Sequence, residues 1–208
     1  MNAPAPPMTA KGRATRDRLL RAARQIVIDS GGHIEIAQLA AAAGVVPSLV
    51  HRYFGSKSGL VNALVDDFYD GLHAAVFAVR FEGKDWAERE RRRLEAGVRF
   101  HLDEPLAVVV YGQLARDPAV ARREAERVAG IVSLGARSVR KGQRAGELPV
   151  GVDPGLAAAA MFGAMRQVMV EALCRARRPS PERVIEALWR QVAASVALDP
   201  TATPVSAF

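Results

Sequence analysis

Apolar residues recur every three or four positions along most of the chain, which is the spacing of one face of an α-helix. The strict apolar–polar alternation of strands does not occur in the sequence, and neither does an internal repeat. We therefore predict an all-α protein. Its nine predicted helices begin near residues 15, 35, 47, 56, 85, 106, 118, 154 and 181.

Capping residues indicate where several of these helices begin. Thr15, Ser56 and Asp85 are expected to start the first, fourth and fifth helices, because a side-chain oxygen there can accept a bond from a free backbone N–H. The fourth helix is expected to reach about Arg80. The fifth carries alternating charges over residues 88–95, which we interpret as a face turned to solvent.

The composition of the two ends predicts the domain organisation. The first dozen residues are rich in Pro and Ala, and the last ten contain two prolines and two threonines, so neither stretch is expected to fold. The predicted division is an arm at 1–12, a three-helix unit at 13–57, a larger helical bundle at 58–198 and a tail at 199–208.

Overall composition favours a soluble cytoplasmic protein. Half of the residues are apolar and a quarter are charged. In the sequence, no apolar run approaches the roughly 18 residues that cross a bilayer, and the start lacks the features of a signal peptide. The single cysteine, Cys174, is expected to be a buried thiol in a reducing compartment. We expect no membrane partner.

Positive charge is concentrated near the start of the chain. The net charge is +7, from 29 basic and 22 acidic residues. Residues 1–60 hold eight basic and three acidic side chains, which gives +5, and the remaining 148 residues hold 21 and 19, which gives +2. A concentrated positive field favours a polyanionic partner such as nucleic acid.

Residues 35–54, EIAQLAAAAGVVPSLVHRYF, have the pattern of a helix-turn-helix. Ala40 is small where the two helices cross, Gly44 permits an unusual turn backbone, and Val45 can fill the space between the helices. The second helix is short and polar on one side, as a helix that enters a DNA major groove must be.

These residues resemble the tetracycline-repressor (TetR) family of transcriptional regulators. The resemblance covers about residues 13–65. It rests on L-A-x-x-A-G-V at 39–45, V-H-R-Y-F at 50–54 and S-K-S-G-L at 56–60. Three positions depart from the family pattern: Val46 stands where Ser or Thr is usual, His51 where Tyr is usual, and Glu35 where Thr commonly opens the helix.

The resemblance implies a dimer that binds double-stranded DNA at a palindromic operator, most simply a repressor that a small-molecule effector releases. The basic arm, with Lys11 and Arg13, is expected to reach phosphates or a minor groove. The residues implied for base and phosphate contacts are Pro47, Ser48, His51, Arg52, Tyr53 and Lys57.

The later helices are expected to hold the effector and the partner subunit. Small residues make the eighth helix apolar nearly all round, so it must be covered on several sides. The candidate effector pocket consists of Phe77, Phe100, His101, Tyr111, Gln113, Met161, Phe162, Met165 and Arg166. The candidate dimer interface is a stripe on the ninth helix, Ile185, Leu188, Trp189, Val192 and Val196.

Other functions have little support in the sequence. His33, His73 and His101 lie far apart in the sequence and in no catalytic or metal-binding motif. We therefore expect no enzymatic activity, no metal and no cofactor. Two alternatives stay open: a helical adaptor that uses the three-helix unit for protein docking, and a small-molecule-binding protein that does not bind DNA.

Overall fold

In the part that the structure describes, the chain consists of helices joined by turns and loops. This computed structural model describes residues 9–112, 114 and 118–198. Within these residues, all nine predicted helices are present and the all-α prediction is confirmed. The helices are α1 (Ala10–Asp29), α2 (Ile36–Ala42), α3 (Pro47–Phe54), α4 (Lys57–Leu72) with a π-helical extension η1 (His73–Phe77), α5 (Trp86–Asp103), α6 (Leu106–Gly112), α7 (Pro118–Arg144), α8 (Pro154–Cys174) and α9 (Pro181–Ser195).

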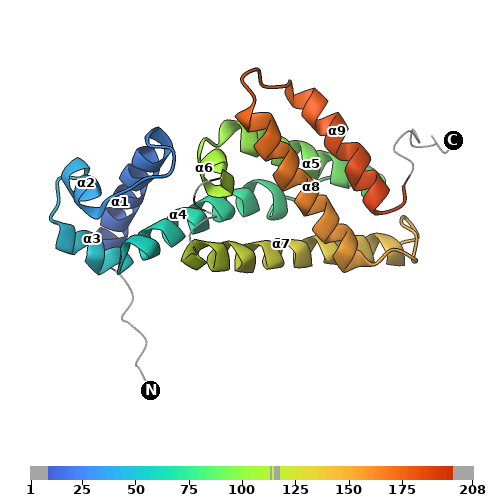
Figure 1. Ribbon diagram of the computed structural model, residues 1–208. Coiled ribbons are helices and arrows are strands. Elements are labelled where there is room, and N and C mark those ends of the chain that lie inside the picture. Colours follow the sequence, from blue (N-terminus) through green and yellow to red (C-terminus); the bar gives the residue numbers. More distant parts are fainter. Residues whose placement is uncertain (1–8, 113, 115–117, 199–208) are drawn as a thin grey trace.

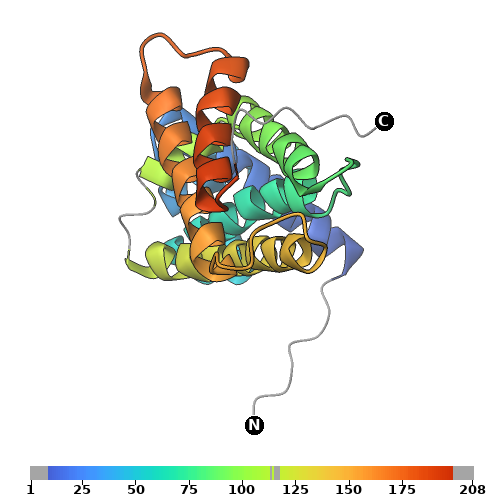
Figure 2. The ribbon, with the colours of Figure 1, turned by 90° about the vertical axis from the view of Figure 1, so that its right-hand side faces the viewer.

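A three-helix unit at one end of the molecule adjoins a larger helical bundle (Figure 1). α2 packs on α1 and α3, and this unit is followed by α4, which leads into the bundle. In the bundle, α8 packs against α7 and α9, and α9 also packs against α5. α8 and α9 lie side by side along one face (Figure 2).

α4 is shared by the two parts. It packs against α1 and α3 on one side and against α7 and α6 further along. Its buried side chains extend from Leu60 to Leu72. The predicted domain boundary between residues 57 and 58 falls in the first turn of this helix, so the division stays a prediction. Any displacement of α4 must change its contacts with both parts.

Caps explain most of the helix starts, with one correction. The Ser56 hydroxyl accepts a bond of 3.0 Å from the Gly59 N–H, and the Asp85 carboxylate caps α5, both as predicted. The prediction that Thr15 caps the first helix is wrong. Thr9 is the cap, which makes residues 10–12 of the expected arm helical, and the Thr15 hydroxyl donates to the Lys11 carbonyl instead.

The charged run of α5 is only partly a solvated face. Glu90 is 9% exposed, and Arg93 binds its carboxylate. Arg89 binds Glu147, and Arg91 binds Glu186. The run therefore joins α5 to other elements, which corrects the prediction that all of it faces solvent.

α8 bears on two further predictions, that no apolar run is long enough to cross a membrane and that Cys174 is buried. By length and composition it is apolar enough to cross a membrane, with a mean hydropathy of 1.3. Core helices of soluble proteins meet the same criterion, and α8 packs along α7 and α9, although only 39% of its apolar window is buried within the chain. Cys174, at its end, is exposed rather than buried.

Candidate DNA interface and ligand pocket

The turn between α2 and α3 holds the two helices in a fixed relation. Gly44 has φ +63°, a left-handed conformation that glycine adopts without steric cost. The Val45 N–H donates to the Ala40 carbonyl at 2.9 Å, which closes the turn. Leu39, Ala40 and Val50 are at most 1% exposed and form the contact between the helices. The predicted helix-turn-helix is therefore present.

α3 presents a polar surface beside this turn. The helix has eight residues, and Val50 is its buried anchor. Its exposed side chains are those of Pro47, Ser48, His51 and Arg52, and the Tyr53 side chain is half-buried. The structure thus brings these five predicted residues together on one short helix, and their contacts with DNA stay a prediction.

Two of the departures from the TetR pattern have visible consequences. Val46, at the start of α3, provides no side-chain cap and is 63% exposed. Glu35 makes no capping bond at the start of α2 and instead accepts a bond of 2.6 Å from Lys57 Nζ. The predicted phosphate-binding lysine is therefore paired with a carboxylate. The pair is open to solvent, with 52% of Lys57 and 72% of Glu35 exposed.

The third departure, His51, has a defined ring orientation. Its Nδ1 lies 3.1 Å from the carbonyl oxygen of Gly55, the residue that follows α3. A carbonyl oxygen only accepts hydrogen bonds, so this contact requires that Nδ1 carry the hydrogen. The ring is thereby held by its own helix end.

An ion-pair cluster joins the three-helix unit to the bundle. Arg24 of α1 binds the carboxylate of Glu104, between α5 and α6, and that of Asp67 in α4. Burial lowers the pKa of Arg24, but the two carboxylates outweigh it and the net shift is upward. Glu104 also accepts a bond of 2.9 Å from the Leu106 N–H at the start of α6. One cluster therefore contacts α1, α4 and α6.

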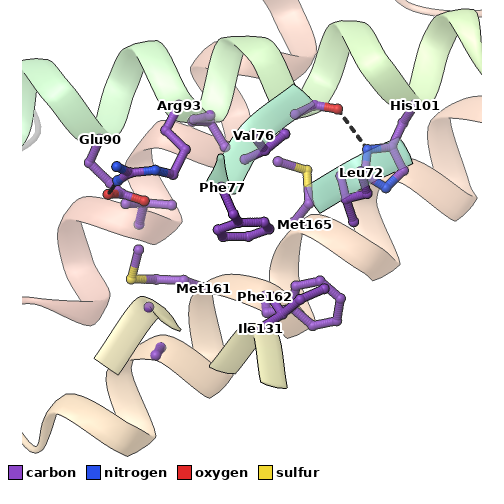
Figure 3. A pocket seen from close by; sticks show the side chains of 15 residues that line it. Leu72, Val76, Phe77, Glu90, Arg93, His101, Ile131, Met161, Phe162 and Met165 are labelled. Atoms are coloured by element: carbon purple, nitrogen blue, oxygen red, sulfur yellow. Dashed lines mark hydrogen bonds and ion pairs between the residues drawn. The ribbon is translucent and has the colours of Figure 1, made fainter. Parts of the chain in front are cut away.

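A small pocket of about 80 Å³ lies within the bundle. Its wall comes from the end of α4, η1, α5, α7, α8 and α9, and most of its side chains are apolar. Phe77 lies near Val76 and Met161 and faces the interior, while Met165 and Phe162 line the α8 side (Figure 3). Such a wall suits a ligand with an apolar body.

The polar groups lie at opposite ends of this pocket (Figure 3). At one end, burial raises the pKa of Glu90, while Arg93 opposes the shift by binding its carboxylate. At the other end, burial lowers the pKa of His101. His101 Nδ1 donates to the Gly97 carbonyl at 2.6 Å, and Nε2 accepts from the Tyr111 hydroxyl at 2.8 Å. Both nitrogens of this neutral ring are therefore already bonded.

Five of the nine residues predicted for the effector pocket line it: Phe77, His101, Met161, Phe162 and Met165. Three of the others do not form its wall. The Tyr111 hydroxyl donates to His101 Nε2, Phe100 packs on Phe68, and Arg166 binds Glu124 at 3.1 Å. Gln113 lies outside the described residues. Whether the pocket binds an effector stays a prediction.

The sequence interpretation missed the end of the pocket that Glu90 and Arg93 form. Glu90 and Arg93 were assigned to a solvated charge run. Their placement follows from a stripe at helical spacing, Trp86, Glu90, Leu94, Gly97 and His101, which is buried along α5. Extending that stripe through the charges would have placed Glu90 inside. In the described part of the chain, no group of three or more His, Cys, Asp or Glu side chains could hold a metal ion.

The predicted dimer interface is not at the surface. Its five side chains are between 0% and 6% exposed within the single chain, because that face of α9 packs against α5 and α8. These residues are therefore not available to a partner, and the prediction is wrong about them. They are Ile185, Leu188, Trp189, Val192 and Val196.

Comparisons with known proteins agree with this geometry. Residues 19–64 match the sequence model described as "Bacterial regulatory proteins, tetR family". Among curated proteins, none matches the sequence.

Solved structures share the fold over most of the chain. One is assigned to the TetR family of transcriptional regulators and comes from Rhodococcus sp.; it is 21% identical with a TM-score of 0.76, and the match covers 88% of this chain and 99% of that one. The fatty acid degradation regulator FadR from Bacillus halodurans is 18% identical, with a TM-score of 0.72 over 89% and 97% of the two chains. FadR from Bacillus subtilis, in complex with stearoyl-CoA, is 16% identical, with a TM-score of 0.71 over 86% and 98%.

In the described residues, the architecture is a helix-turn-helix unit on a larger helical bundle. The match of residues 19–64 includes that unit, and the solved structures extend the likeness to the whole fold. The resemblance to the TetR family seen in the sequence is therefore confirmed for the segment that holds the helix-turn-helix, residues 19–64.

Proposed function

We propose that the chain is a homodimeric repressor that binds a palindromic operator and leaves it when an apolar small molecule enters the bundle. The observation that carries the proposal is the exposed polar face of α3, held by a buried α2–α3 contact in the most basic quarter of the sequence. A regulator of this kind acts in the cytoplasm, where the DNA is.

The three-helix unit, residues 13–57, would supply the DNA contacts. Pro47, Ser48, His51 and Arg52 would face base edges or nearby phosphates, and the Tyr53 hydroxyl would bind a backbone phosphate. Lys57 would add charge at the N-terminus of α4, where unpaired N–H groups already favour an anion.

A second copy of the chain would cover α8. Leu156 is 74% exposed, and Ala159, Ala160 and Gly163 follow it at helical spacing as further exposed positions. This stripe is apolar and flat, so two copies can approach closely about a two-fold axis. It replaces the α9 stripe as the proposed interface, and it explains why so apolar a helix is only partly buried within one chain.

The larger part, residues 58–198, would bind the effector in the pocket. Its apolar wall suits an apolar body, and FadR from Bacillus subtilis, which shares the fold, was solved with stearoyl-CoA. A ligand releases DNA only through different affinities for two conformations. A ligand that displaces His101 would also displace Glu104, which lies one turn further along the chain. Because Glu104 binds Arg24 of α1, the displacement would be transmitted to the three-helix unit.

Selection of genomic fragments tests this function directly. Purified protein is mixed with sheared DNA of the genome that encodes it, at low ionic strength, and the retained fragments are sequenced. We expect a shared palindrome whose half-sites lie about one DNA turn (~34 Å) apart. The Arg52→Ala variant should retain fewer of the same fragments. Folded protein that enriches no fragment would contradict the proposal.

A further inference from the structure

The ring of His51 presents one defined chemical group to the outside of α3. Nδ1 faces the Gly55 carbonyl at 3.1 Å, and Gly55, with φ +75°, ends the helix. In the described part of the chain, His51 has no second hydrogen-bond partner. Because a neutral imidazole has a single hydrogen and Nδ1 uses it, Nε2 has a free lone pair and only accepts.

A hydrogen-bond acceptor on this helix distinguishes the base that presents an amino group from its partner on the other strand, which presents an oxygen. In the major groove, adenine N6 and cytosine N4 are amino donors, whereas guanine O6 and thymine O4 are oxygen acceptors. A lone pair that faces an amino group gains a hydrogen bond, whereas one that faces an oxygen leaves two acceptors opposed. Adenine and cytosine are therefore favoured equally by such a group.

We propose that His51 is a specificity-determining residue that selects an amino base, adenine or cytosine, over guanine or thymine at one position of each operator half-site. The inference rests on the proposed function, since it requires α3 to enter the major groove. Tyrosine, usual at this position in the family, has a hydroxyl that both donates and accepts, so it does not impose this choice.

The neighbouring residue has the opposite chemistry. Arg52 is exposed beside His51 and carries only donors, which suit guanine O6 and N7. Any base preference that Arg52 confers is therefore for a base that presents acceptors, guanine above all. The two side chains can be separated experimentally, because loss of the acceptor and loss of the donor relax different preferences.

A randomised duplex library provides the first test, with selection at pH 8. The parent protein should enrich a palindrome in which one half-site position is A or C on one strand, about tenfold over G or T. His51→Phe keeps a flat ring without the acceptor, and that preference should fall below about twofold while the other positions are kept. His33→Phe is the matched control, because His33 is an exposed histidine of the same unit outside α3, and it should leave every preference unchanged.

Base analogues provide a second test that does not depend on any variant folding. In the selected operator, adenine at the identified position is replaced by purine, which lacks the N6 amino group. The parent should lose about three- to tenfold in affinity. A folded His51→Phe protein should bind the adenine duplex and the purine duplex with the same affinity, within about twofold. The effect of the amino group would then depend on the histidine.

The outcomes separate this inference from the function on which it rests. A parent that enriches no sequence overturns both. A parent that enriches a palindrome, with an unchanged preference in His51→Phe or no loss of affinity for the purine duplex, overturns the role of His51 alone. A shift confined to a position that holds G or T opposite the side chain also overturns it, because the group would then be a donor.

Discussion

An acidic residue lies beside a lysine that we expect to bind phosphate. Glu35 accepts a bond of 2.6 Å from Lys57 Nζ, and both are open to solvent. Such exposed pairs contribute little to stability, but a carboxylate next to a phosphate repels it. The pair therefore affects DNA affinity more than it affects folding.

Removing that carboxylate should strengthen DNA binding. We expect Glu35→Gln to bind a non-operator duplex about two- to fivefold more tightly at low salt, measured by fluorescence anisotropy, because Lys57 is freed and repulsion is lost. Glu82→Gln is the control, since Glu82 forms a similarly exposed pair with Arg80 outside the three-helix unit. Weaker or unchanged binding in Glu35→Gln would show that Lys57 does not reach phosphate.

His101 predicts a pH dependence of stability. Burial lowers its pKa in the folded state, so on acidification the unfolded chain takes up a proton that the folded chain refuses. Stability should therefore fall as the pH drops below the ordinary histidine value of about 6.5, by at most about 1.4 kcal/mol per pH unit.

The comparison for that prediction is His101→Gln, which does not titrate. Denaturant unfolding from pH 8 to pH 5 should show the parent losing stability relative to the variant only below about pH 6.5. Glu90, whose raised pKa acts in the opposite direction on acidification, is present in both proteins and cancels in the difference. Parallel curves for the two proteins would mean that the pKa of His101 is the same in the folded and unfolded states, which would contradict this prediction.

Single residues were predicted well where local chemistry decides their place. Gly44 was expected in a turn that needs its backbone freedom, and it has a positive φ there. The predictions that Cys174 is buried and that Glu90 faces solvent were wrong. Burial depends on the packing of distant helices, and the sequence near each residue does not record that packing.

Among the elements, α3 lacks the cap that its neighbour α4 has. Val46 is in extended conformation, with φ −80° and ψ 147°, and forms no side-chain cap. Val46→Ser should supply that bond and stabilise the protein by about 0.5–2 kcal/mol, or roughly 2–4 °C per kcal/mol in thermal unfolding. Ser56→Ala, which removes the cap of α4, should destabilise it by a similar amount. A Val46→Ser protein no more stable than its parent would contradict this account of α3.

Helix starts were predictable because caps are encoded within a few residues. Ser56 and Asp85 were identified from their type and position alone. The first helix was placed too late, because both Thr9 and Thr15 are suitable caps and only the fold shows which is used. The buried side of α5 was missed because alternating charges concealed a stripe at helical spacing.

For the whole molecule, the proposed dimer depends on α8. Gly163 is exposed, and a Cβ there meets no atom within 4 Å, so the single chain tolerates a side chain at this position. Gly163→Glu should therefore fold and yet convert a dimer into a monomer of 22.3 kDa, measured by light scattering. Gly130→Glu is the matched control, because it lies on α7 with equally free space. A Gly163→Glu protein that remains dimeric would move the interface elsewhere.

The interface also shows what periodicity cannot distinguish. A stripe such as Leu188 and Val192 looks the same whether a neighbouring helix or a second subunit covers it. Here α5 and α8 cover it, and the uncovered apolar stripe is the less periodic one on α8. Fold class and helix order could be derived from the sequence, whereas the pocket wall and the interface required the packing.

The account depends most on DNA binding by α3 and the start of α4. The most direct measurement is the affinity for an operator duplex against salt concentration, for the parent, Arg52→Ala and Lys57→Ala. Arg140→Ala and Lys141→Ala serve as controls, because both are exposed on α7 in the bundle. We expect salt-dependent binding by the parent and weaker binding by both α3–α4 variants, with the slope reduced by about one unit for Lys57→Ala if it neutralises one phosphate. Equal affinity and equal slope in all five proteins, or no salt-dependent binding by the parent, as for a protein-docking adaptor, would contradict the account.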